Sequence, residues 1–364
     1  MSGELLRPGE DWKVINADTL VHLPKLPDCS VDAVVSDPPY GIDFHGEAWD
    51  GKRIRTATDD RTLSAGQAFE RWTSIWAVEC LRVLKPGGHI VTFGATRVAH
   101  RLASGLEDAG LELRDTLMWM YGQGMPKSRR LPGGQGTALK PAYEPIILAR
   151  RPLQGTTRAN VAEWGTGTIN IDPCRIAERP NQAAACTARS HDSSGEGRWP
   201  ANVLLGHADR CSANRCVPDC PAQRLEQQAP GTSRFFYQAK ASRTERDAGC
   251  EQLPARTINL FPSTTSRPGE VRNPHPTVKP LALMRWLVRL ISPEGGLVLD
   301  PFCGSGSTGC AALLEGRRFV GIELDEGHTH IARARITHWA AQRCPEAGRP
   351  RVRPTRAGRS RRPA

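Results

Sequence analysis

The 364-residue sequence has no apolar run long enough to span a bilayer, and its first residues, Met-Ser-Gly-Glu, lack the basic-then-apolar pattern of a secretory signal. We therefore expect a cytoplasmic protein with no membrane partner. Its eleven cysteines include no Cys-x2-Cys pair. In a reducing compartment such cysteines are expected to be thiols or metal ligands, since disulfides rarely persist there. No nuclease or helicase motif is visible, so an attached DNA-cutting activity is not expected.

The positive charge of the chain is concentrated at its C-terminus. The formal net charge is +11, and residues 343–364 contribute eight Arg against one Glu. Pro and Gly alternate with these arginines, a composition that predicts a disordered basic tail. The tail is either a solvated extension or a non-specific contact for nucleic-acid phosphates.

Alternating strand and helix patterns predict an α/β fold, a doubly wound and mostly parallel sheet. The predicted elements include a short helix and turn at 19–27, a helix from residue 66 that residues 85–88 stop, strands at 89–93 and 143–149, and a helix at 281–291. Helical spacing of apolar residues returns after an interruption at residues 151–254, which are rich in Gly, Pro, Arg, Ser and Gln. This pattern favours one α/β domain with an inserted irregular module over two tandem domains. The predicted parts are residues 11–150, an inserted module (151–254), residues 255–342 and the tail (343–364).

The apolar run at residues 31–36 predicts a buried parallel strand that ends in Asp37-Pro38-Pro39-Tyr40. Two prolines fix the backbone and remove two N–H donors, so this turn exposes a carboxylate beside an aromatic face. Such a turn suits an amino group on a planar ring. A packed Pro-Pro turn with no chemical role is the structural alternative.

A second strand–turn–helix signal predicts a nucleotide-type site. The strand at 296–300 runs into a glycine turn and a helix start, where free N–H groups favour an anion. The next strand ends in Glu323, 23 residues beyond Asp300, roughly where such folds place a ribose-binding acid. The third glycine of a dinucleotide site is missing, and Asp300 would repel a pyrophosphate. Both features favour S-adenosylmethionine over NAD.

With these two motifs the chain resembles the site-specific DNA amino-methyltransferases, which act on N6 of adenine or N4 of cytosine. The order of the motifs, with the insert between them, resembles the β group of that family. The resemblance covers residues 11–150 and 255–340. It implies a catalytic half at 11–150, an inserted target-recognition module at 151–254 and a cofactor-binding half at 255–342. It implies that Asp18 contacts the cofactor adenine, that Glu323 contacts its ribose, and that the segment 273–280 also binds cofactor through Thr277 and Lys279. The implied cofactor residues of the glycine turn are Asp300, Pro301, Phe302, Cys303, Gly304, Ser305, Gly306 and Thr308.

The resemblance implies that Asp37, Pro38, Pro39 and Tyr40 are catalytic. The Asp37 carboxylate and the Pro38 carbonyl would accept the two N–H bonds of the target amine, and Tyr40 would stack on a base flipped out of double-stranded DNA. Most members of the family with Asp at the first position of the catalytic motif methylate adenine, so N6 of adenine is predicted as the target. The alternatives are N4 of cytosine, an RNA or glutamine amide substrate, and a non-catalytic DNA-binding protein. The sequence leaves open whether the protein is a homodimer.

Three further segments carry weaker signals. His207, Cys211, Cys216 and Cys220 could hold a structural zinc ion, or they could be ordinary thiols and a histidine. Residues 233–240 interleave aromatics with cations and suggest either a nucleic-acid surface or a strand that packs the insert on the main domain. The aperiodic segment 41–61, with Lys52, Arg53 and Arg55, could close over DNA or simply be mobile.

Overall fold

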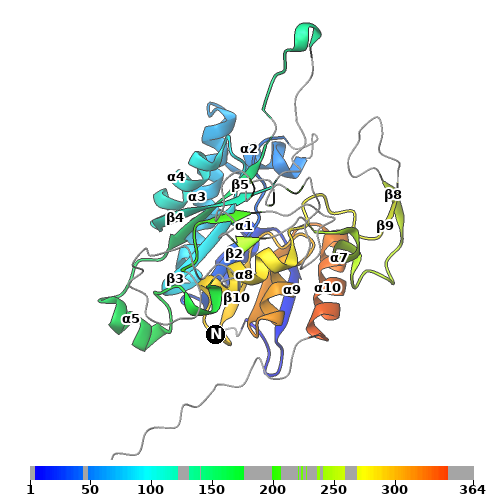
Figure 1. Ribbon diagram of the computed structural model, residues 1–364. Helices are drawn as coiled ribbons and strands as arrows, with labels where there is room; N and C mark the ends of the chain where they lie inside the picture. The colour runs from blue at the N-terminus through cyan, green and yellow to red at the C-terminus, as the bar shows by residue number, and fades with distance from the viewer. Residues whose placement is uncertain are drawn as a thin grey trace, which may run out of the picture.

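The structure, a computed structural model, describes residues 5–43, 48–121, 131–139, 141–175, 199–205, 241–258 and 269–342, together with residues 220, 223, 227, 236 and 237. In this part of the chain a large twisted sheet runs through the molecule with helices on both of its faces (Figure 1). Among the described residues, no helix combines the length and the apolar character needed to cross a bilayer.

The sheet has nine strands in the order β1-β11-β10-β2-β3-β5-β4-β6-β7 among the described residues. The first five run parallel, β5 is antiparallel to both β3 and β4, and β6 and β7 are parallel to β4 and to each other. The mostly parallel α/β prediction is therefore confirmed. The bounds are β1 Trp12–Asn16, β2 Val31–Ser36, β3 Leu84–Phe93, β4 Glu112–Met120, β5 Tyr143–Arg150, β6 Val203–Leu205, β7 Phe236–Tyr237, β10 Leu297–Asp300 and β11 Arg318–Glu323.

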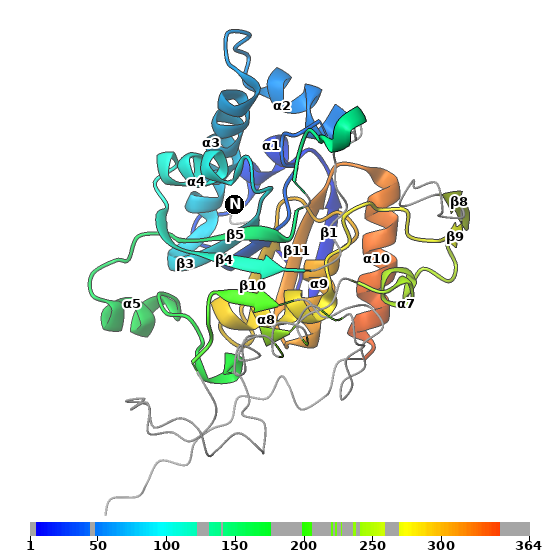
Figure 2. The same cartoon turned by 45° about the horizontal axis from the view of Figure 1, so that its top comes forward.

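Two apolar layers hold the helices to the sheet. Because successive strand residues point to opposite faces, Val34 of β2 packs in one layer and Val35 in the other. One face is covered by α3 (Ala65–Val83) and α4 (Ala99–Asp108), and the other by α8 (Leu281–Ile291), α9 (Ser307–Leu314) and α10 (Glu326–Ala340), as Figure 2 shows. Every residue of β2 is buried, as its continuous apolar run predicted.

Most predicted helices and strands appear within a few residues of their expected bounds, and α8 matches its predicted range of 281–291. Residues 85–88 were expected to stop the preceding helix, and α3 does end at Val83, but the next strand was expected to begin only at His89. Strand β3 begins at Leu84, directly after α3, and pairs with Val31 before a register shift. Gly87, with φ +75°, accommodates the irregularity in backbone direction.

The connections create a switch point between β10 and β2. These two strands are parallel neighbours, with Leu299 opposite Val34. From β10 the chain enters α9 on one face, whereas from β2 it continues to α3 on the other face. In open α/β sheets the crevice outside the carboxyl ends of such a strand pair is where ligands bind. The fold therefore brings the ends of β2 and β10 to that crevice.

The described residues of the predicted irregular module contain regular elements. Strands β6 and β7 extend the main sheet beyond β4, which the sequence did not predict. Residues 236–237 of the aromatic segment form β7, consistent with the strand alternative. Outside the sheet are α5 (Thr157–Trp164), α7 (Arg243–Asp247) and the hairpin of β8 (Arg256–Ile258) and β9 (Gly269–Val271). The domain boundaries stay a prediction.

The short helical elements also differ from expectation. The segment 41–61, expected to lack regular structure, contains the 3-10 turn Ala48–Asp50 and α2 (Lys52–Ala57). Between β1 and β2 lie α1 (Thr19–His22) and the 3-10 turn Leu23–Lys25, close to the predicted helix and turn. The predicted tail at residues 343–364 lies outside the described residues.

Candidate active site

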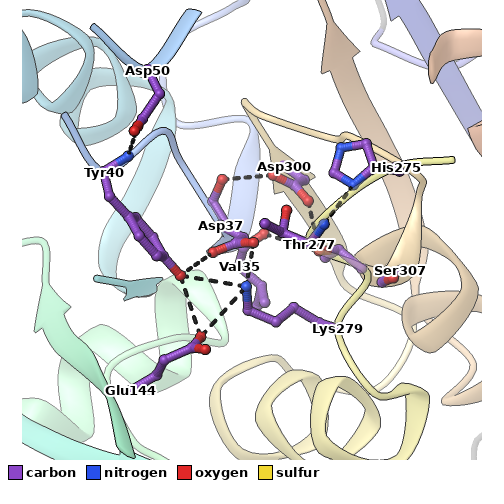
Figure 3. A network of polar contacts seen from close by, with 12 residues as sticks. Val35, Asp37, Tyr40, Asp50, Glu144, His275, Thr277, Lys279, Asp300 and Ser307 are labelled. Atoms are coloured by element: carbon purple, nitrogen blue, oxygen red, sulfur yellow. Dashed lines mark hydrogen bonds and ion pairs between the residues drawn. The ribbon is translucent and has the colours of Figure 1, made fainter. Parts of the chain in front are cut away.

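The structure brings the residues after β2 and β10 together. We call residues 37–40 the proline turn and residues 300–308 the glycine loop. The Ser36 hydroxyl, at the end of β2, donates to Asp300 Oδ1 at the end of β10 over 2.6 Å, although 264 positions separate them in the sequence. Figure 3 shows Asp37 and Tyr40 of the proline turn close to Asp300 of the glycine loop. The two predicted half-sites are therefore adjacent.

The Asp37 carboxylate is engaged on both oxygens. Oδ1 accepts from the Tyr40 hydroxyl at 2.7 Å, and Oδ2 pairs with the Lys279 ammonium. Burial raises the pKa of Asp37, while the positive charge of Lys279 opposes that shift. Burial and the neighbouring Asp37 charge raise the pKa of Tyr40 well above its usual value, so this hydroxyl stays a hydrogen-bond donor.

Asp50 holds the backbone of the proline turn and the residues after it. Its Oδ1 accepts from the N–H groups of Tyr40 and Gly41 at 2.5 and 2.8 Å, and its Oδ2 accepts from the N–H of Ile42 at 3.2 Å (Figure 3). The Asp50 side chain is buried. A buried carboxylate that accepts three main-chain donors fixes the orientation of the Tyr40 ring relative to Asp37.

The glycine loop is shaped from within by Asp300. Besides Ser36, its carboxylate accepts from the Thr308 hydroxyl at 2.6 Å and from the Phe302 N–H at 3.1 Å. Burial raises the pKa of Asp300 to about 6, and these hydrogen bonds oppose the shift. The carboxylate thus orders the loop, and its role in binding a cofactor stays a prediction.

Two glycines let the loop turn sharply into α9. Gly304 and Gly306 have φ values of +54° and +77°, in the left-handed region that favours glycine. A Cβ at Gly304 would lie 2.7 Å from His275 Nε2, and one at Gly306 would lie 3.0 Å from the Cα of Ala332. The loop is thus packed tightly between the segment 273–280 and α10.

The other predicted residues of the loop divide into a buried and a partly exposed set. Cys303, Ser305 and Thr308 are buried, and Arg335 of α10 donates to the Ser305 carbonyl oxygen at 2.7 Å. The Phe302 ring is partly exposed and packs against Trp72 and Trp76 of α3. Pro301 is buried, and its carbonyl oxygen accepts from the Thr19 hydroxyl.

The two predicted ribose- and adenine-contacting acids lie at neighbouring strand ends. Glu323, the last residue of β11, accepts from the Gly304 N–H at 2.7 Å, so this acid and the loop are in direct contact. Asp18, just beyond β1, caps α1 by accepting from the Leu20 N–H at 2.9 Å. Because β1 and β11 are adjacent, both carboxylates lie at the edge of the sheet that also carries the glycine loop.

The segment 273–280 crosses between the two half-sites. His275 lies beside Gly304 and stacks edge-on with His328, and burial lowers the pKa of His275 well below its usual value. The Thr277 N–H donates to His275 Nδ1 at 3.3 Å. Lys279, grouped with the cofactor residues from the sequence, instead places its ammonium at Asp37 and 3.6 Å from Glu144 Oε2.

Glu144, Asp50 and Arg335 were missed from the sequence. The sequence did offer a clue for Glu144, because it is an acid at the second position of a predicted strand. Only the antiparallel direction of β5 brings that end of the strand to the carboxyl edge of β3. Asp50 and Arg335 carry no comparable signal, because Asp50 lies in an aperiodic segment and Arg335 reaches the glycine loop from α10.

The predicted zinc ligands are not assembled in the described structure. His207, Cys211 and Cys216 lie outside the described residues, and Cys220 is buried. Within the part of the chain that the structure describes, no group of three or more His, Cys, Asp or Glu side chains could hold a metal ion. Zinc binding therefore gains no support here.

Comparison with known proteins agrees with the site. The model of a DNA methylase family matches residues 31–334. The chain belongs to this family, and it is a DNA methyltransferase of the N6/N4 type. This confirms the resemblance inferred from the two motifs.

Two curated relatives and one solved structure extend the comparison. The Type II methyltransferase M.HindIII of Haemophilus influenzae is 24% identical over 350 residues, covering 89% of this chain and 94% of the relative. M.HpaI of Haemophilus parainfluenzae is 22% identical, covering 90% and 74%. The structure of PvuII DNA methyltransferase, which is cytosine-N4-specific, aligns with a TM-score of 0.53 at 14% identity over 92% of each chain. That likeness concerns the fold.

Proposed function

We propose that this protein transfers a methyl group from S-adenosylmethionine to N6 of adenine in a base flipped out of double-stranded DNA. The observation that supports this proposal most strongly is the meeting of the proline turn and the glycine loop at the β2–β10 switch point. The amine-accepting group and the nucleotide-type loop then serve one reaction centre. Catalysis at such a centre rests on orientation and on complementary charge.

The residues at the glycine loop fit S-adenosylmethionine. Glu323 and Asp18 offer carboxylates at the ends of β11 and β1 for hydroxyl and amino donors of a nucleoside. The N-terminus of α9 offers main-chain N–H groups to a carboxylate, and Phe302 offers an aromatic face. When bound, the cofactor supplies an electrophilic methyl group on a sulfonium.

At the proline turn the target amine would donate one N–H to the Asp37 carboxylate and one to the Pro38 carbonyl oxygen. Such bonds draw the nitrogen out of conjugation with the ring, so that its lone pair forms the new N–C bond while the S–C electron pair stays on sulfur. The nitrogen is cationic until it loses a proton, for which Asp37 is the nearest acceptor. Tyr40 would support the flipped base by stacking.

Adenine is favoured over cytosine by the identity of the first residue of the turn. Aspartate there resembles the adenine-specific members of the family, whereas serine more often accompanies cytosine. N4 of cytosine is the second candidate, because the two amines present the same donor pair and the PvuII enzyme has the same fold. A fold-only DNA-binding role is disfavoured by the charged partners assembled around Asp37.

We expect the protein to act in the cytoplasm of a bacterium or phage-infected cell, on DNA, as the methylating part of a restriction-modification system. Lys52 and Arg53 of α2 are exposed and belong to the segment that follows the proline turn. They are candidates for phosphate contacts next to the flipped base. Their contribution should fall as the salt concentration rises.

Expression in a host without DNA methylation, followed by modification-sensitive sequencing of its DNA, tests the proposal. N6-methyladenine at one recurring sequence is the expected result. N4-methylcytosine at such a sequence would replace adenine as the target. DNA without either modification, from cells that contain folded protein, would contradict the proposed reaction.

A further inference from the structure

Asp37 is one member of a group of three charged side chains. The Lys279 ammonium pairs with Asp37 and lies 3.6 Å from Glu144, and the side chains of Lys279, Asp37 and Glu144 are 7%, 15% and 21% exposed. They come from the segment before α8, from the end of β2 and from β5 (Figure 3). Three charges that are mostly buried and come from three distant segments interact strongly, because water screens them poorly.

The Lys279 ammonium is held in place by more than its ion pairs. It lies 4.8 Å from the centroid of the Phe93 ring and 5.8 Å from that of Tyr40, within range of cation–π attraction. The Leu281 N–H, two residues on, donates to Glu245 Oε1 at 2.5 Å and anchors the backbone that carries Lys279. These contacts therefore hold the ammonium at a defined position in the site.

We propose that Glu144 and Lys279 act as an opposed pair of positioning charges that keep Asp37 an ionised acceptor and leave the amine pocket with one net negative charge. This inference rests on the proposed function, because it concerns the same amine site. Two carboxylates and one ammonium sum to −1, which matches the single positive charge that develops on the target nitrogen. In this proposal neither Glu144 nor Lys279 contacts the reacting atoms.

The directions of the pKa shifts agree with this arrangement. Burial and the Glu144 charge raise the pKa of Asp37, and Lys279 lowers it. Asp37 and Glu144 in turn raise the pKa of Lys279 against the effect of burial. Without the ammonium, two neighbouring carboxylates would compete for one proton, and Asp37 would lose its role as a pure acceptor.

Other titratable groups face Asp37 or Glu144. Tyr40 donates to Asp37 and lies 3.4 Å from Glu144 Oε2, and Tyr121 at the end of β4 donates to Glu144 Oε1 at 3.4 Å. Asp300 approaches from β10, and the charge of Asp37 contributes to the raised pKa of Asp300. The tyrosines stay neutral near pH 7, because burial raises the pKa of each. The charges of Lys279 and Glu144 therefore determine whether Asp37 is ionised.

The test uses the wild-type protein, Glu144→Gln, Lys279→Met and the double variant. It measures single-turnover methylation of DNA from pH 5.5 to 9 and the dissociation constant of S-adenosylmethionine. Glu144→Gln should slow methylation about tenfold and move the acid limb of the pH–rate profile to lower pH. Lys279→Met should slow it about 100-fold at pH 7 and move the acid limb to higher pH by about one unit.

The double variant gives the sharpest outcome. It restores one net negative charge, so it should be about tenfold faster than Lys279→Met alone. The proposal would be overturned if the double variant were no faster than Lys279→Met. It would also be overturned if the acid limb of the pH–rate profile stayed at the same pH in all four proteins. Cofactor affinity should change less than about twofold in each variant. A large loss of that affinity in Lys279→Met would restore the cofactor role expected from the sequence and overturn the inference.

Lys85→Met is the matched control. Lys85 pairs with Asp32 at 2.6 Å near the other end of β2, so this variant also removes a lysine from a carboxylate of the same strand. It should lower stability and leave the pH profile unchanged. A carboxyl NMR titration of Asp37 in the same proteins reports its ionisation without turnover. If wild-type protein does not methylate DNA, the proposed function fails, and the titration still decides whether Lys279 and Glu144 control Asp37.

Discussion

The glycine loop and the proline turn lie side by side, yet they are stabilised by different means. In the glycine loop, Asp300 binds Phe302 and Thr308, both within eight residues of it, and one partner from β2. In the proline turn, Asp37 meets Lys279, 242 residues away, and Glu144 lies within 3.6 Å of the same ammonium. The Asp300 carboxylate is thus held mainly by groups close to it in the sequence, whereas the Asp37 carboxylate also depends on charged side chains from distant segments.

This difference predicts different responses to substitution. Substitutions that distort the glycine loop should lower stability and cofactor affinity. Substitutions that alter the charges around Asp37 should lower the methylation rate and change its pH dependence. Four substitutions test that contrast within the proposed function.

The largest effect is expected for Asp37→Ala. The substitution removes the acceptor of the target amine and should lower the methylation rate by about 10³-fold or more, since positioned charge is the main catalytic contribution at such sites. Cofactor affinity should stay within about twofold of wild type, because the glycine loop is left intact. Single-turnover kinetics with labelled S-adenosylmethionine measure both quantities, and a rate near that of wild type would contradict the mechanism.

Gly306→Ala should act on the loop. The new Cβ would lie 3.0 Å from the Ala332 backbone at a φ of +77°, so the free energy of unfolding should fall by about 3 kcal/mol. Cofactor affinity should fall at least about tenfold. Gly295→Ala is the matched control: its φ is +69° with nothing within 4 Å, and it should cost only about 1 kcal/mol. Denaturant titration and calorimetry compare them, and equal losses would show that the close contact is unimportant.

Asp300→Asn should change the pH dependence of stability. The folded-state pKa of Asp300 is about 6, above the unfolded value of 3.8, so the folded protein binds this proton more tightly. Stability contributed by the protonated group is therefore lost as pH rises from about 4 to about 6, by up to about 3 kcal/mol. The variant lacks this proton, so the difference between wild-type and variant unfolding energies should fall across that window. A difference that stays constant would refute the shift.

Asp50→Asn should have the smallest of these effects. An amide cannot accept from all three main-chain N–H groups, so stability should fall by about 2 kcal/mol and methylation by about tenfold through misplacement of Tyr40. Asp60→Asn in the same stretch is the control, because Asp60 is exposed and binds only Thr62. Thermal unfolding and single-turnover rates distinguish the two, and identical behaviour would remove Asp50 from the positioning role.

The sequence predicted the features that depend on neighbouring residues. The buried run of β2, the helix α8 and the glycine loop each have a local pattern, and each appears near its expected position. The antiparallel direction of β5 and the added strands β6 and β7 depend on pairing between distant segments, which no local pattern encodes. The start of β3 at Leu84 was missed because Pro and Gly normally mark turns, whereas here they lie in an irregular strand.

The candidate site shows the same limit. Asp37, Gly304 and Glu323 were predicted from motifs, and the structure places them around one crevice. Their partners were missed, because Glu144 and Arg335 reach the site only through the tertiary fold and Asp50 lies in a segment without a periodic pattern. Lys279 was selected for the right region, and its contact with Asp37 became evident only from the arrangement of β2 and the segment before α8.

The central claim is that the proline turn and the glycine loop form one methyl-transfer centre for an amine of DNA. Incubating purified protein with DNA and S-adenosylmethionine labelled on its methyl group, followed by nucleoside analysis, tests it most directly. The account predicts label in N6-methyladenine with wild-type protein and none above background with Asp37→Ala. Label that persists in the Asp37→Ala reaction, or that appears in protein and not in DNA, would contradict it.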